Sequence, residues 1–419
     1  MLRGMKHVLP LMALLVTTAL VGCDDEPFET LCDDLNACAC PAPPCTADTP
    51  TLSAAQVVAP SADLPPEVIS QDAHNNLDIA LHDGRLFFVF RTAPSHFASP
   101  ETRLYVVSTT DHVEWRYEGV FHEGRDLREP RFLSLDGRLF LFYARLGTSS
   151  IDFEPGGAVL VGYNGPNDWS EPFDAFPEGF IPWRLEERPG EAWLIGYTGG
   201  EDIYSSDESE LAVAWFKSSD GVNWIPAVNM DDGGVVLRGG ISETDLAFTA
   251  DGGIVAVGRN EAGDVVDGEI RFGSRICRAE AGALGDWTCK DDPRKYDSPL
   301  VFRHGATVYL VGRRNVTEDG HYDLGGEGSL VGKRLRYLAD YWVQPKRCAL
   351  WTVDRETLTV SHVLDLPSAG DTCFASVVQL DAHQYLLYDY TSPVDDPDRV
   401  WMDGQNGQTL IHRMTLVLP

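Results

Sequence analysis

A repeat of about 53 residues is the feature that most constrains the fold of this 419-residue chain. Its marker is a tight turn followed by an apolar run. Gly84, Gly137 and Gly190 stand in the first three of these turns and are 53 residues apart, as are Gly252 and Gly305 further along the chain. A fixed period of this length indicates one supersecondary unit that stacks on copies of itself.

Each repeat is composed of short strands rather than helices. The apolar runs that follow Asp83-Gly84 and Asp136-Gly137 are β-rich, and Asp-Gly between such runs is a strong hairpin signal. Helical periodicity is nearly absent, so the chain is predicted to be an all-β, six-bladed β-propeller of four-stranded antiparallel blades over residues 69–419. The inner strands are expected to start near residues 76, 129, 182, 243, 298 and 374. We expect an insertion in the last unit, residues 315–345, with residues 330–342 as a candidate short helix.

The first 22 residues are typical of an export signal. Arg3 and Lys6 precede an apolar run from Val8 to Val21, which is too short to remain as a membrane anchor. The run ends at Gly22-Cys23 and resembles the bacterial lipoprotein signal, in which the cysteine is acylated; an ordinary secretory signal is the alternative. We therefore predict lipidation of Cys23, a Cys- and Pro-rich flexible tether over residues 23–68, and a place in the bacterial cell envelope, on the periplasmic or cell-surface side.

The remaining eight cysteines form an even set, which suits an oxidising compartment. Hairpin placement predicts a Cys277–Cys289 disulfide, and proximity to the last blade predicts Cys348–Cys373. The other four cysteines crowd the tether and their pairing is left open: Cys32, Cys38, Cys40 and Cys45. Metal binding by this tail is the alternative, but Cys-x-Cys without histidine is a weak zinc pattern, so no metal site is predicted.

Two of the repeats end in a turn of the form Ser/Thr-x-Asp-x-x-x-Trp, at residues 109–115 and 218–224. These turns resemble the Asp-box of the sialidase superfamily, whose fold is a six-bladed propeller. The resemblance covers roughly residues 70–419 and points to a poorly characterised bacterial branch. It is most specific in four segments: Asp126–Pro130, Ser242–Asp245 with Arg259, Ser298-Pro299 with Arg313, and Gly370–Phe374.

Hairpin polarity places the start of each inner strand and the end of its neighbour at the same mouth of the propeller. Several arginines gather there, and arginine binds a carboxylate in a bidentate fork. We therefore predict an acidic or hydroxyl-rich ligand; the alternative is that each arginine pairs with a carboxylate of its own hairpin. The predicted ligand-binding residues are Arg91, Arg128, Arg259, Arg313, Trp183, Arg184 and Asp245.

The resemblance implies roles for part of this set. Arg259 and Arg313 match the second and third arginines with which sialidases hold the sugar carboxylate, and Glu243 matches the glutamate that polarises the nucleophile. The first arginine is missing, because Asn75-Asn76-Leu77 stands where sialidases have Arg-Ile-Pro, and Arg91 is the candidate substitute.

Two further departures concern catalysis. No aspartate lies near His96, where the sialidase acid/base is expected, so His96 is a candidate proton carrier. Phe374 stands at the position of the tyrosine nucleophile, which leaves Tyr388 or Tyr390 to replace it. Carboxylates at the mouth suit a different glycosidase mechanism, and the predicted catalytic residues are Glu243, Asp371 and His96.

A net charge of −31 disfavours nucleic acid as a partner, and the membrane is expected to be reached through the lipid anchor alone. Structural calcium is a weak alternative at the acidic loops 264–269 and 395–403, since such runs are usually solvated, and no other cofactor is predicted. The sequence thus predicts a sialidase-like propeller that binds a glycan or glycoconjugate and, if it is an enzyme, is a glycoside hydrolase. The alternative is a non-catalytic binding or scaffold propeller.

Overall fold

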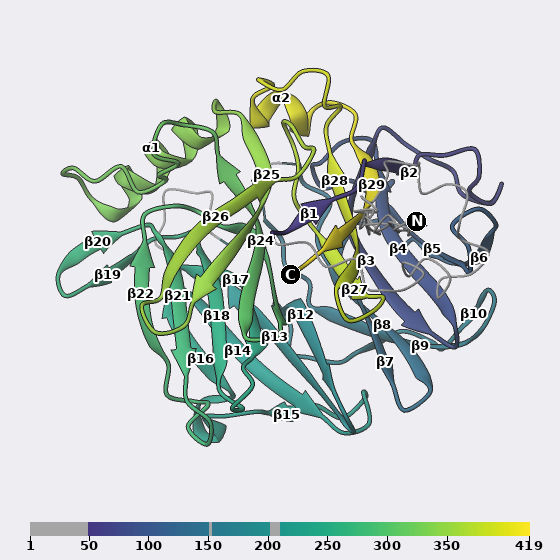
Figure 1. The fold of residues 1–419 in the computed structure, drawn as a ribbon, viewed down its shortest axis with the longest axis horizontal. Coiled ribbons are helices and arrows are strands. Elements are labelled where there is room, and N and C mark those ends of the chain that lie inside the picture. Colours follow the sequence, from purple (N-terminus) through teal and green to yellow (C-terminus); the bar gives the residue numbers. More distant parts are fainter. Residues whose placement is uncertain (1–48, 151–152, 202–209) are drawn as a thin grey trace, which may run out of the picture.

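The computed structural model describes residues 49–150, 153–201 and 210–419. In these residues six antiparallel sheets stand around a common axis, which confirms the predicted propeller (Figure 1). The inner strands start within three residues of the predicted positions. They are β3 (Ala73–His82), β7 (Leu127–Leu135), β12 (Ile181–Arg188), β17 (Ile241–Phe248), β23 (Asp297–His304) and β27 (Ser376–Gln379).

The first three blades are completed by strands that follow their inner strands directly. Blade one continues with β4 (Arg85–Ala93), β5 (Arg103–Thr109) and β6 (Trp115–Phe121). Blade two continues with β8 (Arg138–Arg145), β9 (Ala158–Gly165), β10 (Asp168–Trp169) and β11 (Phe173–Asp174). Blade three continues with β13 (Glu191–Gly199), β14 (Leu211–Ser218), β15 (Ile225–Pro226) and β16 (Val235–Gly239), with the 3₁₀ turn η2 (Met230–Asp232) between β15 and β16.

The other blades carry additions. Blade four continues with β18 (Ile254–Asn260), β21 (Ser274–Ala279) and β22 (Thr288–Asp292), and a small hairpin of β19 (Asp264–Val266) and β20 (Glu269–Arg271) interrupts it. Blade five continues with β24 (Thr307–Asn315), β25 (Lys346–Asp354) and β26 (Thr359–Asp365). Blade six continues with β28 (Gln384–Thr391) and β29 (Leu410–Val417), with helix α2 (Trp401–Gln405) between them.

Helix α1 (Leu330–Trp342) has the predicted bounds, but it does not belong to the last unit. It connects β24 to β25 and is therefore an insertion in the fifth blade. Both helices lie at one end of the propeller, whereas β15 lies at the other end (Figure 1).

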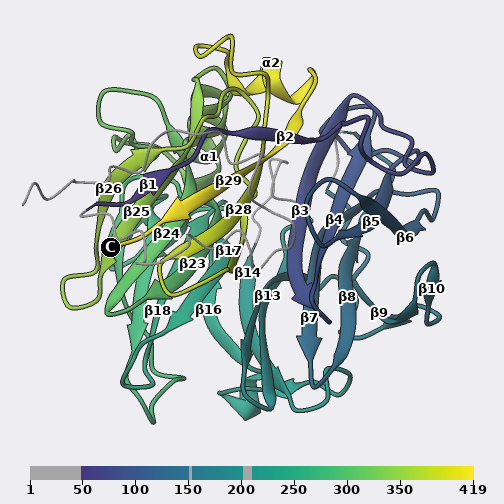
Figure 2. The same ribbon diagram turned by 45° about the vertical axis from the view of Figure 1, so that its right-hand side comes forward.

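The sixth blade is closed by strands from the beginning of the described chain. β1 (Thr51–Leu52) and β2 (Gln56–Ala59) both pair antiparallel with β29 (Figure 2). These residues fall inside the segment predicted as tether, 23–68, so the propeller begins earlier than residue 69. The pairing was missed because the two strands are short and their partner lies more than 350 residues away.

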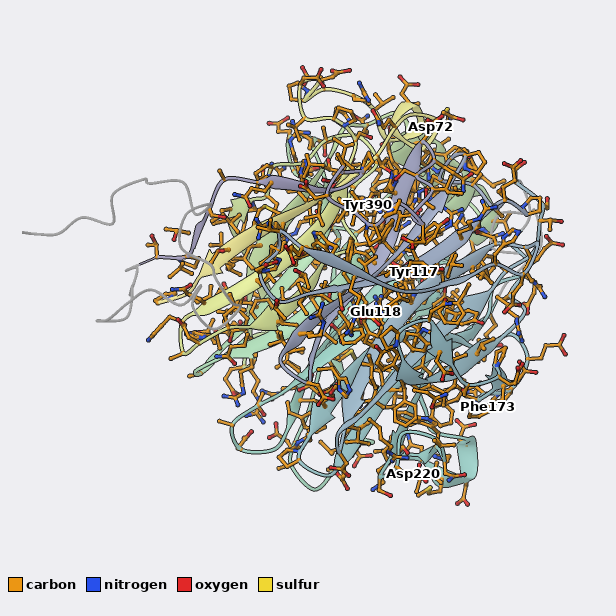
Figure 3. The ribbon with its side chains drawn as sticks, turned by 90° about the vertical axis from the view of Figure 1, so that its right-hand side faces the viewer. Asp72, Tyr117, Glu118, Phe173, Asp220 and Tyr390 are labelled. Atoms are coloured by element: carbon orange, nitrogen blue, oxygen red, sulfur yellow. A yellow bond between two sulfur atoms is a disulfide. The ribbon has the colours of Figure 1, made fainter. Side chains whose placement is uncertain are left out.

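The turns of the repeat have the expected geometry. Asp83 and Gly84 have φ values of 48° and 71°, and Asp136 and Gly137 have 49° and 72°. Positive φ at both central residues matches the right-handed twist of hairpin strands, which is why Asp-Gly recurs there. In the Asp-box turn, Asp220 Oδ1 accepts hydrogen bonds from Val222 N at 2.9 Å and Asn223 N at 2.7 Å, at the end of the molecule away from the helices (Figure 3).

Carboxylates on the inner strands join each blade to the next. Asp78 Oδ2 of blade one accepts a hydrogen bond from Phe132 N of blade two at 2.7 Å. Asp245 Oδ2 of blade four likewise accepts one from Val301 N of blade five at 2.5 Å. Both acids are buried, and each bond spans one period of the repeat. The repeat thus supplies the contacts that hold neighbouring blades together.

We predict that deleting residues 49–59 will destabilise the propeller by about 3 kcal/mol or more, because it exposes an edge of β29 and removes the buried Val58 and Ala59. Thermal unfolding of the deletion variant measures this loss. A chain that starts at residue 49 is the control, since it keeps both strands. Equal melting temperatures for the two chains would show that the closing strands are dispensable.

We also predict that Asp389 makes a contribution to the free energy of unfolding that falls as the pH rises from about 5 to about 7.5. Burial raises the pKa of Asp389 to about 7, so the folded chain keeps a proton there that the unfolded chain has already released. Buried histidines such as His74, whose pKa burial lowers to about 4, act in the opposite direction, so the comparison is made between variants. Urea unfolding at pH 5 and pH 7.5 should show that the stability of Asp389→Asn relative to the unmodified chain rises with pH. A relative stability that stays constant or falls over this interval would contradict the prediction.

Candidate functional site

A cavity of about 540 Å³ lies over the axis at the end that carries the helices. Its floor comes from the inner and second strands of several blades, and its upper wall comes from loops and from α1 and α2. A cavity of this volume is in the range of small-molecule sites. Five of the predicted site residues line it: His96, Arg128, Glu243, Arg259 and Arg313.

A β-bulge at the start of the inner strands directs side chains into this cavity. The strand register shifts between Asn75 and Leu77 in blade one, and between Arg128 and Arg131 in blade two. Asn76 and Glu129, one period apart, have positive φ values of 43° and 51°. A bulge re-aims a side chain that regular alternation would place elsewhere, and both residues line the cavity.

Arg259 is the centre of a buried charge cluster on the floor. Its guanidinium donates to Glu243, lies 2.6 Å from Glu261 Oε2, and has Nε 3.0 Å from Asp297 Oδ1. Lys295 Nζ adds a second cation 2.5 Å from Glu261 Oε2. Glu243 also accepts a hydrogen bond from Ser298 N at 2.8 Å. Arg259 is thus engaged by three carboxylates of the chain itself.

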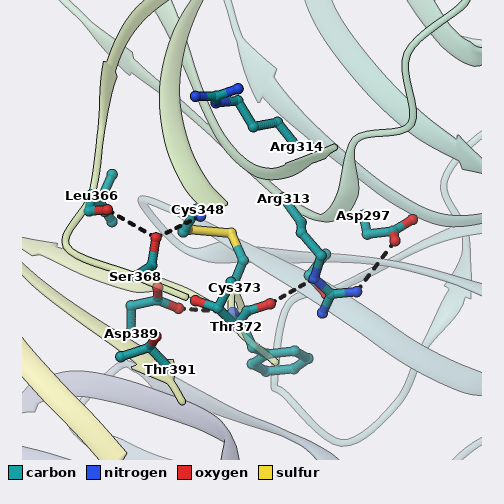
Figure 4. Close-up of a disulfide and its surroundings, with 12 residues drawn as sticks. Asp297, Arg313, Arg314, Cys348, Leu366, Ser368, Thr372, Cys373, Asp389 and Thr391 are labelled. Atoms are coloured by element: carbon teal, nitrogen blue, oxygen red, sulfur yellow. Dashed lines mark hydrogen bonds and ion pairs between the residues drawn. A yellow bond between two sulfur atoms is a disulfide. The ribbon is translucent and has the colours of Figure 1, made fainter. Parts of the chain in front are cut away.

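Arg313 is held in the same way, by blades five and six (Figure 4). Its Nε donates to Thr372 O at 2.6 Å, and Nη1 lies 3.2 Å from Asp297 Oδ2. Thr372 precedes Cys373, which forms a disulfide with Cys348 across the two blades, with a Cα–Cα distance of 4.9 Å. The disulfide therefore fixes the segment that positions Arg313.

Asp371 organises a second group of cavity side chains next to Arg313, whose Nη2 lies 3.4 Å from Tyr390 Oη. It is fully buried, does not line the cavity itself, and binds three side chains that do. Its Oδ2 lies 2.7 Å from His96 Nδ1, and its Oδ1 accepts hydrogen bonds from Tyr390 Oη at 2.9 Å and Trp401 Nε1 at 3.0 Å. Although burial alone would raise the pKa of Asp371, His96, Arg313 and the Tyr390 hydroxyl hold it below its usual range. Asp371 is therefore a charged positioning group behind His96 and Tyr390.

The protonation of His96 and Tyr390 follows from this arrangement. Burial lowers the pKa of His96, against the pull of Asp371, so the neutral ring with its Nδ1–H on Asp371 is favoured. Burial and Asp371 raise the pKa of Tyr390 well above its usual value, which keeps the phenol protonated. Tyr388 does not line the cavity and instead lies 3.3 Å from His112. Of the two tyrosines considered as replacements for Phe374, Tyr390 alone faces the site.

Arg91 and Arg128 share one carboxylate. Arg91 Nε donates to Asp126 Oδ1 at 2.9 Å, and Arg128 Nε donates to Asp126 Oδ2 at 2.5 Å. Arg128 also donates to the backbone oxygen of His96 and lines the cavity, whereas Arg91 is fully buried beneath it. Arg91 therefore supports the loop around His96 and does not present charge to a ligand.

Three other predicted ligand-binding residues lie outside the cavity lining. Trp183 Nε1 and Arg184 Nε both donate to Pro299 O, at 3.3 Å and 3.0 Å. The carboxylate of Asp245 accepts a hydrogen bond from the backbone N–H of Val301 in blade five. These three side chains are buried among the inner strands and stabilise the ring.

Glu129 is a site residue that is not among those predicted from the sequence. It lines the cavity, and within the described residues its one hydrogen bond comes from Asn76 Nδ2 at 3.2 Å. Burial raises the pKa of Glu129 to about 7; Arg131 opposes the rise and the charge of Glu243 adds to it. The signal was present in the repeat, because Glu129 and Glu243 both stand at the start of an inner strand.

The two predicted disulfides are confirmed: Cys277–Cys289 has a Cα–Cα distance of 4.0 Å, and Cys348–Cys373 is described above. In the part of the chain that the structure describes, one group of potential metal ligands lies close together, and it consists of Asp389 and the two cysteines of the second disulfide. Because those sulfurs are bonded to each other, the group is not a metal site. At the loops suggested for calcium, Asp264 is instead paired with Arg275 at 2.6 Å.

The predicted signal peptide, the lipidated Cys23 and the four tether cysteines lie outside the described residues. Among the helices that the structure describes, none is both long enough and apolar enough to cross a membrane.

Comparisons place the fold among known propellers. No family model and no curated protein matches the sequence. A protein of unknown function from Dyadobacter fermentans has a similar structure, with a TM-score of 0.56 and 13% identity over 89% of this chain and 100% of that one. An α-L-arabinanase from Penicillium chrysogenum, complexed with arabinobiose, has a TM-score of 0.50 and 12% identity over 87% and 98% of the two chains.

A Trypanosoma rangeli sialidase in complex with the inhibitor DANA has a TM-score of 0.49 and 12% identity, over 82% of this chain and 55% of that one. At 12–13% identity these similarities establish the fold alone.

We predict that Arg259→Ala will destabilise the protein by about 3–5 kcal/mol, because it leaves Glu243, Glu261 and Asp297 with unbalanced buried charge. Urea unfolding measures this loss. Arg238→Ala is the matched control, since Arg238 makes an exposed ion pair with Asp232 and should change stability little. If Arg259→Ala is as stable as the control, the cluster is not the structural centre of the floor.

Proposed function

We propose that this protein is a carbohydrate-active propeller whose cavity binds a neutral, hydroxyl-rich sugar, and that it hydrolyses a glycosidic bond there. The observation that carries this proposal is the pair Glu129 and Glu243, two carboxylates in one cavity with different partners. Glycoside hydrolysis needs one carboxyl group as acid and a second as base or nucleophile.

The charge balance of the cavity favours a neutral sugar over an acidic one. Arg128, Arg259 and Arg313 are each bound by carboxylates or carbonyl oxygens of the chain. A guanidinium engaged in this way has little capacity left for the bidentate fork that an anionic ligand requires. Hydroxyl groups both donate and accept hydrogen bonds, and they suit a floor in which donors and acceptors are already balanced.

The two carboxylates differ in how well their charge is stabilised. Glu243 has the Arg259 guanidinium and the Ser298 N–H, which oppose the increase in pKa that burial causes. Glu129 has one amide donor and a pKa of about 7, so it is largely protonated in mildly acidic solution. We therefore assign Glu129 as the general acid that protonates the leaving oxygen and Glu243 as the base or nucleophile. His96 and Tyr390, both oriented by Asp371, are assigned to binding sugar hydroxyls.

The arabinanase structure supports a sugar ligand in this kind of propeller, since it was obtained with arabinobiose. The second candidate function, sugar binding without hydrolysis, is favoured by a different observation: Phe374 lines the cavity where the resemblance expects a tyrosine, and it has no hydroxyl.

We further propose that export and acylation at Cys23 place the propeller at the cell envelope. Palmitate labelling that persists in Cys23→Ser would refute the lipid anchor.

We predict that the pH profile of kcat/KM on an alkyl glycoside of a neutral sugar will fall above about pH 7, because Glu129 must be protonated to act as the acid. Glu129→Gln should lower kcat by about 10²–10⁴-fold and remove this basic limb. A panel of alkyl pentosides and hexosides provides the substrates, because their poor leaving groups require protonation.

Glu171→Gln is the control, because Glu171 is exposed and does not line the cavity. Full turnover by Glu129→Gln would overturn the assignment of the acid. Binding of neutral glycosides without turnover would favour the second candidate, and tighter binding of acidic sugars would contradict the proposed ligand class.

A further inference from the structure

The upper wall of the cavity differs in chemistry from its floor. Besides the polar Gln405 and Asn406 at the end of α2, this wall has five apolar or aromatic side chains, which we call the hood: Phe97, Leu338, Trp342, Trp401 and Met402. They come from the loop between β4 and β5, from α1 and from α2, and none of them carries a charge. The floor below them presents the glutamates and arginines of the cavity, together with serines and the rings of Phe374 and Tyr390.

The hood is fixed to the floor by two buried hydrogen bonds. Tyr341 of α1 donates its hydroxyl to Asp297 Oδ2 at 2.7 Å, and Asp297 is the carboxylate shared by Arg259 and Arg313. Trp401 of α2 donates Nε1 to Asp371, which holds His96. Each helix therefore docks through an aromatic donor on one of the carboxylates that organise the site.

The two helices also pack against each other. The rings of Tyr341 and Trp401 meet edge to face, with centroids 5.3 Å apart. Lys346, just after α1, donates to Tyr341 O at 2.5 Å and to Gln344 O at 2.8 Å. Trp401 N in turn donates to Gln344 O at 3.2 Å. The hood is thus preformed, so a ligand that contacts it loses little free energy in ordering it.

From this two-part cavity we infer the substrate class: a glycoside whose sugar lies on the polar floor and whose aglycone is an aryl or alkyl group held under the hood. The inference rests on the proposed sugar site and extends it to the leaving group. The apolar wall is continuous with the floor in one cavity, and about 540 Å³ accommodates more than a single sugar ring. An aromatic or aliphatic aglycone is the occupant whose burial against uncharged rings is favourable.

Two measurements test the inference on the full-length chain. In the first, calorimetry compares phenyl and methyl glycosides of the same sugars, across neutral pentoses and hexoses. We expect the phenyl glycoside to bind about tenfold more tightly, and we expect Trp342→Ala to bring that ratio close to one. Equal affinities of phenyl and methyl glycosides for the unmodified protein would overturn the inference.

The second measurement does not depend on the sugar. The neutral fluorophore N-phenyl-1-naphthylamine should bind the hood, with an affinity about tenfold lower in Trp342→Ala and reduced in Met402→Ser. Met402 is 38% exposed, so its replacement preserves the fold if the tryptophan variant does not. Ile225→Ser is the control, because Ile225 is 51% exposed on β15, outside the cavity, and this variant should bind the probe normally.

Probe binding that is absent, or unchanged in both hood variants, would overturn the hood as an apolar subsite. If no glycoside in the panel binds while the probe binds as predicted, the proposed sugar site fails and the hood stands as an apolar site in its own right. The two failures are therefore distinguishable.

Discussion

Closure of the ring is the constraint on which the rest of this structure depends. Six sheets around an axis bring the floor of the cavity together only if the last blade is held next to the first. Here β29 is covered by β1 and β2 on one side and β28 on the other, so the outer edge of the sixth blade is paired. The Ser376 hydroxyl of that blade donates to Asp78 of the first blade at 2.6 Å, which joins the two ends of the ring. Side chains from all six blades can therefore line one cavity, Tyr197 of β13 being the contribution of blade three.

Within this ring, Asp297 is the residue that couples the site to the inserted helix. It is fully buried and lies within 4 Å of Arg259, Arg313 and Lys295 and accepts the Tyr341 hydroxyl. A buried carboxylate is tolerable when cations and donors surround it, and these cations come from blades four and five. Although burial alone would raise the pKa of Asp297, these cations lower it to about 2. The same charge therefore orients two floor arginines and anchors α1.

The sequence was sufficient for the features that repeat. The turns, the alternation and the tryptophan markers are local, and they predicted the inner strands within three residues. The closing strands at residues 51–59 are not predictable from the repeat, because their pairing with β29 is non-local and lies outside the repeating pattern. The inserted segment 315–345 was predicted in the sixth unit, whereas it belongs to the fifth. It separates β24 from β25 and so interrupts the regular spacing of the strands in the fifth blade.

The site was predictable in place but not in detail. Hairpin polarity brought His96, Arg128, Glu243, Arg259 and Arg313 to one mouth, and all of them line the cavity. Their partners lie partly on neighbouring blades, as with Arg91 and Asp126, and a repeat pattern does not report contacts between its units. Tyr388 and Tyr390 lie on the same face of β28, and only their depth along the strand separates a core residue from a cavity residue.

The pairing of the arginines changes how an Arg-rich mouth is interpreted in so acidic a chain. The sequence carries 33 Lys and Arg against 64 Asp and Glu, so carboxylates are in excess over the cations that they pair with. Arg259 and Arg313 use this surplus to make a floor of fixed, mutually satisfied charges, which needs little reorganisation when a ligand arrives. Such a floor offers directional hydrogen bonds and little net charge. The rings of the hood above it offer apolar surface, and burial of a ligand against that surface is favourable in any orientation. A ligand that is hydroxylated at one end and apolar at the other complements both halves of the cavity at once.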